Sequence, residues 1–483
     1  MHKRGLAALL GTFLIFTGLA SAPSTASQTR VGQAADSSRS SPRKQKVDLW
    51  VVPVNLADGR AVDRGKLRAA VNETVRFFAV DSNGLLSLKA RTLPTVTSTS
   101  RGCSPPVTSI SRRVARKNKR INNEKDVVVL AFPDIGDCDE VGVGGDSGFA
   151  WKSAACWDSL DSAHCLRHEL GHALYNLHHD NRITCEDENG KPIVYGGSCI
   201  LDEYRNPYTV MGNSYNGGGL HAADLISEGL RPNSSATFAA ESRTVTLTPR
   251  SRPSGTLSLV VPLLNRGGGS GGARSRLELE YRTATGTDSW LGDNTVAGAD
   301  NPGTGVLVSL AGASPFAELD RHPSGDYSFG DPLDRGLLNM HPERSEFTPA
   351  MHAGDSWAAP DGSVRITVMS ETPEAAVVRV DHAQDTKAPY PFKLGRPSQF
   401  SLGQKSRVFI GFGTPGDNVA VRRFKIEISG QKSFYVAGDR AVQRVSQGEV
   451  MRVLPRGRYT VRVTAEDYSG NKTRSNQRVV VVR

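Results

Sequence analysis

The first half of the chain alternates short apolar runs with patterns of helical period. Residues 47–56 form an almost unbroken apolar run that predicts a buried strand, and an amphipathic helix is expected over about residues 63–80. Further strands are expected over residues 85–90 and 126–132, with a basic helix between them. Strands that alternate with helices in this way predict an α/β arrangement for this part of the chain.

From Arg243 onward the pattern changes to a one-by-one alternation of apolar and polar positions, which is typical of half-buried β-strands. The first alternating positions are Val245, Leu247, Leu257, Leu259 and Val261. The alternation resumes after a linker at residues 385–391, and no helical pattern interrupts it. We therefore predict a multidomain protein with an α/β (α+β) domain over residues 47–235, a β-rich accessory domain over residues 240–382 and a small β-sandwich over residues 388–483.

The N-terminal residues have the pattern of a secretory signal. A short basic head precedes an apolar run over residues 6–19, and small residues then favour cleavage after Ala26. Residues 27–46 lack an apolar pattern and are expected to be a disordered leader. No later stretch is apolar for the length needed to span a bilayer, so we expect a secreted, extracellular protein.

The cysteines agree with an exported protein. Their even number predicts up to three disulfides in one domain, and Cys185 and Cys199 are close enough in sequence to close a local loop. The rival interpretation, a zinc–thiolate cluster, lacks a C-x-x-C pair. The six cysteines are Cys103, Cys138, Cys156, Cys165, Cys185 and Cys199.

The formal net charge of +10 favours adhesion to acidic surfaces such as cell walls or anionic polymers. Part of this charge lies in a basic run over residues 112–120, in a predicted helix. No aromatic residues interleave with these side chains to stack on bases, so the run is interpreted as a solvated face and nucleic acid is not an expected partner.

The stretch that carries candidate chemistry begins His168-Glu169-Leu170-Gly171-His172. Residues four apart project from the same face of a helix, so His168 and His172 can direct their imidazoles at one metal ion. Zinc lowers the pKa of bound water toward about 7, and a carboxylate beside it can take up the proton during hydrolysis. Glu169 is the candidate for this general acid/base role.

Two adjacent histidines follow as candidates for the third ligand. We choose His178, which gives the spacing H-E-x-x-H-x5-H, and His179 would then lie behind the ligands or face solvent. A residue of slack at the turn of Asn176 would reverse this choice. Asp180 could orient a ligand imidazole, or it could equally cap the end of the helix.

With these residues the chain resembles the metzincin metallopeptidases, whose motif is H-E-x-x-H-x-x-G-x-x-H followed by a turn that contains a methionine. Tyr175 stands at the glycine position, so Asn176, which tolerates a left-handed backbone, is expected to make the turn instead. Met211, in the stretch Tyr208-Thr209-Val210-Met211-Gly212, matches the methionine under the zinc site of that family. Tyr208 and Tyr215 are candidates to stabilise an oxyanion, as a turn tyrosine does in some metzincins.

Two flanking regions extend the resemblance more weakly. Residues 217–230 look like the small closing helix of the gametolysin-like, M11-type branch, and the β-rich region after them is similar to the region that follows the catalytic domain there. The last segment, with Tyr459-Thr460-Val461 and Asp467-Tyr468-Ser469-Gly470-Asn471, resembles a fibronectin type III or bacterial Ig-like module.

The resemblance implies a secreted zinc endopeptidase with one catalytic ion, acting on proteins or peptides in a cleft between two lobes. The extended residues 142–151 would be either the edge strand that pairs with substrate or a structural hairpin. The C-terminal domains are candidates for binding an acidic cell-surface polymer, and a calcium requirement stays open. Two alternatives remain: a cell-wall binding or adhesion protein with a scaffold-like peptidase domain, and a zinc hydrolase that acts on cell-wall peptide amides.

Overall fold

The protein is described here by a computed structural model that is mostly β, with several sheets and few helices. The predicted signal peptide and residues 27–41 of the predicted leader lie outside the described residues, whereas Gln45 and Lys46, the last residues of that leader, already belong to the first strand. The described residues are 42–99, 107–122, 125–133, 142–145, 152–156, 163–212, 218–263, 275–292, 303–312, 317–321, 335–344, 346–395, 398–402, 405–413, 417, 421–437 and 447–482.

The first sheet has the strand order β2-β1-β4-β6-β5, with β3 also paired to β1. All pairings in it are parallel except that of β5 with β6, which is antiparallel and places β5 at the edge. The strands are β1 (Gln45–Asn55), β2 (Leu86–Thr92), β3 (Val96–Thr97), β4 (Val127–Ala131), β5 (Gly142–Gly145) and β6 (Lys152–Cys156).

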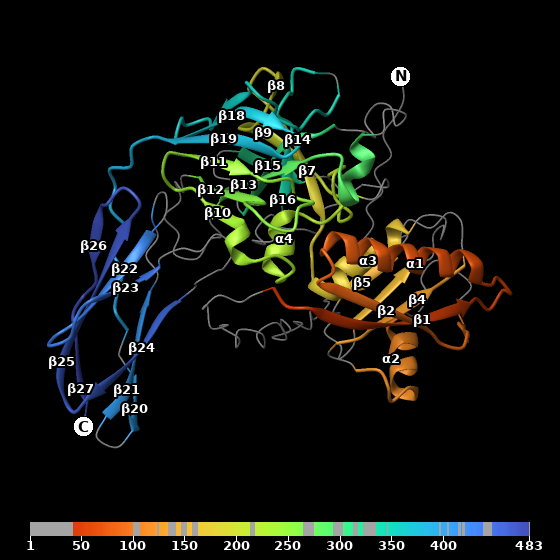
Figure 1. The fold of residues 1–483 in the computed structure, drawn as a ribbon, viewed down its shortest axis with the longest axis horizontal. Helices are drawn as coiled ribbons and strands as arrows, with labels where there is room; N and C mark the ends of the chain where they lie inside the picture. Colours follow the sequence, from red (N-terminus) through yellow and green to blue (C-terminus); the bar gives the residue numbers. More distant parts are fainter. Residues whose placement is uncertain are drawn as a thin grey trace, which may run out of the picture. The chain divides into compact units, whose positions relative to one another are not determined.

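Helices cover both faces of this sheet (Figure 1). The apolar residues of β1 alternate between two cores: Leu49 and Val51 pack with α1 (Arg64–Asp81) and α3 (His164–Tyr175), and Trp50 and Val52 pack with α2 (Val107–Lys117). A strand buried on both faces explains why this run is continuously apolar. The expected helix over residues 63–80 is present as α1, where Asp63 caps the first turn by accepting from the backbone N–H of Gly65.

A nine-stranded sheet follows, in the order β10-β12-β13-β14-β16-β7-β9-β15, with β8 paired to β7. Its strands are β7 (Asp180–Glu186), β8 (Pro192–Ile193), β9 (Gly197–Asp202), β10 (Ala236–Phe238), β12 (Ser258–Pro262), β13 (Arg276–Arg282), β14 (Gly305–Ala311), β15 (Ala317–Arg321) and β16 (Arg335–Leu338). Strands β7 and β9 lie within residues 47–235, the range predicted above for the α/β domain. They nevertheless pair with β16 and β15, which belong to the predicted accessory domain.

A four-stranded sheet in the order β11-β19-β18-β17 shares its core with the nine-stranded sheet. Its strands are β11 (Arg243–Leu247), β17 (Ser356–Ala358), β18 (Val364–Thr372) and β19 (Ala375–His382). The predicted alternation is confirmed at Val245 and Leu247, which are both buried on β11. A short 3-10 helix, η2 (Gly286–Gly292), interrupts the run of strands, contrary to the helix-free expectation.

The C-terminal strands form two antiparallel sheets around one core, as predicted for a β-sandwich. Phe424, Ile426 and Ile428 alternate into this core from β22. One sheet contains β20 (Ser398–Leu402), β21 (Lys405–Gly413) and β24 (Gln447–Pro455), and the other contains β22 (Val421–Ile428), β23 (Phe434–Ala437), β25 (Gly457–Asp467), β26 (Lys472–Arg474) and β27 (Arg478–Val482).

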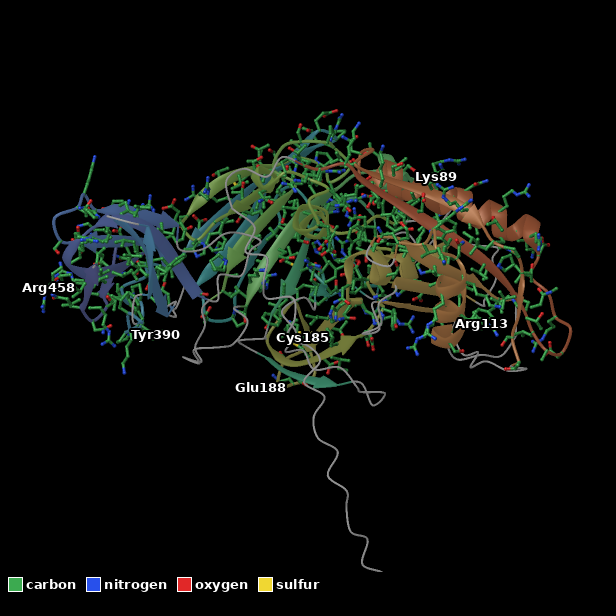
Figure 2. All side chains as sticks on the ribbon, turned by 90° about the horizontal axis from the view of Figure 1, so that it is seen from below. Lys89, Arg113, Cys185, Glu188, Tyr390 and Arg458 are labelled. Atoms are coloured by element: carbon green, nitrogen blue, oxygen red, sulfur yellow. A yellow bond between two sulfur atoms is a disulfide. The ribbon has the colours of Figure 1, made fainter. Side chains whose placement is uncertain are left out.

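A disulfide joins the neighbouring strands β7 and β9. Cys185 and Cys199 are direct partners in the antiparallel register and are bonded to each other, which confirms the predicted local loop. Figure 2 shows Cys185 and, close to it, Glu188 in the loop that follows β7. Among the described residues, no helix is long and apolar enough to cross a membrane.

Buried ion pairs connect α1 to the strands of the second sheet. Arg250 lies within 2.6 Å of Asp81 at the end of α1 and within 3.0 Å of Asp288 on η2. Arg282 pairs with the same Asp288 and with Glu280. All five side chains are almost fully buried, so removing one partner would leave an uncompensated charge, which typically costs about 3–5 kcal/mol.

His221, just before α4 (Ala222–Ser227), extends this network. Its Nδ1 lies 3.1 Å from Glu280, and its Nε2 lies 3.7 Å from Asp180. Burial lowers the pKa of His221, but the charges of Asp180 and Glu280 outweigh burial and the opposing charge of Arg335, so the pKa is raised above its ordinary value. The folded protein therefore favours the charged imidazolium more than an exposed histidine would.

A pH dependence of stability follows from that shift. A raised pKa in the folded state stabilises the fold fully below about pH 6.5, the unfolded value of histidine, and this contribution is lost as the pH rises through the folded pKa. We expect the free energy of unfolding of the natural protein to fall across that alkaline limb in urea titrations. His221→Gln should be less stable at pH 6, and its free energy of unfolding should fall less steeply as the pH rises. An equally steep fall in this variant would mean that other groups cause the loss of stability.

Candidate metal centre

Helix α3 presents two histidines on one face and packs the other face into the core. Leu166, Leu170 and Leu174 are buried against the first sheet. His168 and His172 lie one turn apart, with their Nε2 atoms separated by 3.1 Å. The N-cap residue, Ala163, makes no side-chain cap, so packing rather than capping holds the start of this helix.

The helix ends in a left-handed turn at Asn176, which has φ 52° and ψ 40°. Its backbone N–H donates to the carbonyl oxygen of His172, while Tyr175 remains in the last helical turn. The prediction that Asn176 turns the chain in place of the family's glycine is confirmed. Asparagine adopts this conformation at lower cost than most residues, because its short polar side chain bonds locally.

The turn brings His179, and not His178, to the other two histidines. The Nε2 of His179 lies 3.1 Å from the Nε2 of His172, and one nitrogen from each of His168, His172 and His179 lies within 4.8 Å of the others. His178 is not in this group: the chain has no regular structure between Asn176 and the start of β7 at Asp180, and its path there directs His179 at the other two rings. His179 therefore takes the place given to His178 in the sequence analysis.

The other nitrogen of each ring is held by an oxygen acceptor. The Nδ1–H of His168 donates to the carbonyl of Val210 at 2.8 Å, and that of His172 donates to the carbonyl of Leu177 at 2.5 Å. The Nδ1–H of His179 donates to the carboxylate of Glu203 at 2.5 Å. With the proton fixed on Nδ1, each Nε2 is left with its lone pair directed at the common centre.

Glu203 was not found by the sequence analysis. It follows directly on β9, and it reaches His179 because the antiparallel pair of β7 and β9 aligns Arg182 with Asp202. That register places the end of β9 beside the start of β7. Glu203 is separated from His179 by 24 positions, so no short sequence motif links the two residues.

Burial keeps the three imidazoles neutral. It lowers the pKa of His168 to about 3, with the neighbouring His172 contributing in the same direction. It lowers the pKa of His179 to about 2, with further lowering by His172 and His168, and it also lowers the pKa of His172. Neutral imidazole is the form that binds metals, so these residues are ready to bind at neutral pH.

The spacing of the nitrogen atoms fits zinc. A tetrahedral ion with Zn–N distances of about 2.0–2.1 Å separates its nitrogen ligands by about 3.3 Å. The two distances of 3.1 Å among His168, His172 and His179 are close to that value. Three lone pairs directed at one point repel each other unless a cation lies between them. Among the described residues, His168, His172 and His179 therefore fit a metal ion with three protein ligands.

Glu169 and Met211 are both buried, Glu169 on α3 and Met211 in the core that α3 packs into. Glu169 is buried on α3 directly after His168. Met211 is fully buried in the same core as α3, and a Cβ on Gly171 would lie only 2.3 Å from its sulfur atom. The methionine turn therefore packs against the metal helix at a position where a side chain larger than glycine would collide with it.

Asp180 holds this turn rather than a ligand ring. Its backbone N–H donates to the carbonyl of Met211 at 2.9 Å, and its carboxylate accepts from the Thr209 hydroxyl at 2.6 Å. Of the two functions considered for Asp180, the orientation of an imidazole is performed by Glu203 on His179.

Tyr208 does not reach the site, although it was a candidate to stabilise an oxyanion. Its side chain is fully buried, and its hydroxyl donates to the carbonyl of Gly303 at 2.9 Å. It packs with Leu307 and Leu337 of the nine-stranded sheet, because its position in the turn directs it away from α3. The other candidate, Tyr215, lies outside the described residues.

No family model matches the sequence, and no curated protein matches it. Solved structures with partial likeness include a chaperone–substrate complex, with 20% identity and a TM-score of 0.25 over 35% of this chain and 28% of that one. Metalloproteinase-II from Bacteroides fragilis has 14% identity and a TM-score of 0.22 over 29% of this chain and 45% of that one. Wild-type OgpA from Akkermansia muciniphila has 10% identity and a TM-score of 0.20 over 92% and 96%.

The chain thus spans less than half the length of the first two of these structures. At such TM-scores the likenesses carry no argument about function.

The choice between the adjacent histidines can be tested by zinc content. His179→Ala should lower zinc affinity by more than about 100-fold, because even residues that only orient a ligand contribute 10–100-fold. His178→Ala, the matched control, should retain its zinc. Chelator competition followed by metal analysis measures both; retention of zinc by His179→Ala together with loss in His178→Ala would reverse the assignment.

Proposed function

We propose that the protein is a secreted zinc-dependent endopeptidase that hydrolyses peptide bonds in proteins. The observation that carries the proposal is the convergence of His168, His172 and His179 on one point, with Glu169 between the first two on the same helix. Three neutral nitrogen ligands with a carboxylate next to one of them in the sequence are the residues that a hydrolytic zinc site uses, and its fourth position would take water or substrate. Structural zinc sites, by contrast, use four protein ligands.

Each residue has a distinct task in this proposal. The three histidines hold the ion, which when bound supplies Lewis-acid chemistry by polarising the scissile carbonyl and lowering the pKa of water. Glu169 takes the proton from the attacking water and returns it to the amine of the leaving peptide. Glu203 keeps the Nε2 of His179 unprotonated, and Met211 supports α3 from beneath.

The edge of the first sheet supports a peptide as the substrate. Strand β5 (Gly142–Gly145) pairs with β6 on one side, and both strands lie against α3. A strand at a sheet edge offers backbone N–H and C=O groups to which an extended peptide can pair. A peptide bound there would lie along the element next to the metal helix, so we favour substrate pairing over a purely structural hairpin.

The fold as a whole is proposed to be metzincin-like, with an upper α/β lobe that ends in α3 and a lower part that carries Met211. Export through the predicted signal peptide agrees with the Cys185–Cys199 disulfide, since such bonds persist in oxidising environments. The β-rich region and the C-terminal sandwich are proposed to hold the enzyme near an acidic surface polymer, for which the net charge of +10 is suited.

The catalytic role of Glu169 can be tested in the zinc-loaded protein. Glu169→Ala should lower kcat for cleavage of a quenched fluorescent peptide by several orders of magnitude, because the general base is lost. Zinc content and the melting temperature should stay close to those of the natural protein, since Glu169 is not a ligand. Turnover within a few-fold of the natural protein would remove Glu169 from the mechanism.

Casein digestion with and without chelator then separates the classes of function. Chelator-sensitive cleavage of casein supports the endopeptidase. Cleavage of cell-wall peptides alone would replace it with a wall amide hydrolase, and cleavage of neither by the zinc-loaded protein would favour a binding protein with an inactive scaffold.

A further inference from the structure

An exposed tyrosine lies on the metal centre and is not part of the motif. The ring centroid of Tyr204 is 3.6 Å from that of His179, with a tilt of 34° between the planes. It is 5.6 Å from the ring centroid of His168, with a tilt of 32°. The side chain is nevertheless 42% exposed, so one part of the ring contacts the ligands while another part faces solvent.

The backbone of Tyr204 is held in an unfavourable conformation. Its φ of 61° falls in the left-handed region, which is rare for a residue with a large side chain. The backbone N–H donates to the Oδ1 of Asn181 at 3.3 Å, and Asn181 is a buried residue of β7. Strain of this kind persists only where the surrounding structure holds it, and it clusters at functional sites.

Tyr204 and Glu203 both contact the imidazole of His179, from different sides. The carboxylate of Glu203 bonds the Nδ1 edge of His179, while the ring of Tyr204 covers one face of that imidazole. Both residues directly follow β9, whose pairing with β7 is fixed by the disulfide between Cys185 and Cys199 and by the ion pair between Arg182 and Asp202. The hairpin therefore places the two side chains opposite the ligand that precedes β7.

We propose that Tyr204 is a positioning residue for the metal centre: its aromatic ring fixes the plane of the His179 imidazole, so that the Nε2 lone pair stays aimed at the ion. The hydrogen bond to Glu203 sets the tautomer of His179 and holds the Nδ1 edge of the ring. The contact with the Tyr204 ring then limits tilting of the imidazole away from the ion. The inference rests on the proposed zinc site but not on peptidase activity.

The chemistry of the role lies in the ring, not in the hydroxyl. Contacts between aromatic rings are favourable beyond the burial of their area, and this one needs a flat side chain on the imidazole face. Phenylalanine preserves that contact, while leucine keeps apolar bulk without the flat face. Alanine removes both.

The experiment measures metal binding in the full chain with Tyr204→Phe, Tyr204→Leu and Tyr204→Ala. Readouts are the zinc dissociation constant from chelator competition and the visible absorption of the Co²⁺-loaded protein, which reports ligand geometry. We expect Tyr204→Ala and Tyr204→Leu to weaken zinc binding about tenfold, as loss of a ligand-orienting partner does, and to alter the cobalt spectrum. Tyr204→Phe should match the natural protein within about twofold in both readouts.

Tyr390→Ala is the matched control, since Tyr390 is a comparably exposed tyrosine, labelled in Figure 2, that precedes the C-terminal strands. It should change neither readout. Natural zinc affinity and cobalt spectrum in Tyr204→Leu would overturn the proposal even if Tyr204→Ala failed to fold. A loss in Tyr204→Phe equal to that in Tyr204→Ala would overturn it as well, because the hydroxyl would then be the active group.

The two proposals fail in different ways. If zinc affinity depends on Tyr204 but the loaded protein cleaves no peptide, the endopeptidase is rejected and the positioning role stands. If the protein cleaves casein while zinc binding is indifferent to Tyr204, the positioning role is rejected and the endopeptidase stands.

Discussion

The rest of the structure depends on the repulsion among three imidazole lone pairs that share one small volume. Each of His168, His172 and His179 donates its Nδ1–H to an oxygen acceptor, so a shift to the tautomer with the proton on the inner nitrogen would lose that hydrogen bond. Burial adds to the constraint by disfavouring the charged form of the rings. The turn that contains Met211 and the β7–β9 hairpin hold two of these oxygen acceptors in place. A bound cation would remove the repulsion among the three Nε2 lone pairs.

The acceptors come from three separate parts of the chain, which must therefore be held together firmly. Val210 belongs to the turn that is anchored through Asp180 and Thr209, and Glu203 belongs to the end of a disulfide-linked hairpin. The carboxylate of Asp180 in turn lies near His221, which joins the buried charges of the second sheet. A buried network of this kind contributes little net stability compared with apolar packing, but breaking one of its contacts would leave a buried charge or polar group without its partner, which disfavours other arrangements of these segments.

The sequence was informative where local geometry decides the outcome. The spacing of His168 and His172, the left-handed turn at Asn176, the local disulfide and the alternation of the β-strands all follow from periods and conformational preferences of neighbouring residues. It was not informative where partners distant in the chain decide. The choice of His179 depends on the path after the turn, Glu203 on a strand register, and the burial of Tyr208 on a sheet whose strands begin well downstream.

The membership of β7 and β9 in the nine-stranded sheet has a further consequence for how the chain could be divided. The strand that begins one residue after His179 pairs with β16, and β9 pairs with β15, so His179 and Glu203 are built on a framework completed more than a hundred residues later. A fragment that ends near residue 240 would lose that framework while keeping the whole H-E-x-x-H helix. Such a fragment would keep His168 and His172 on their helix but would lack the strands that support the third histidine.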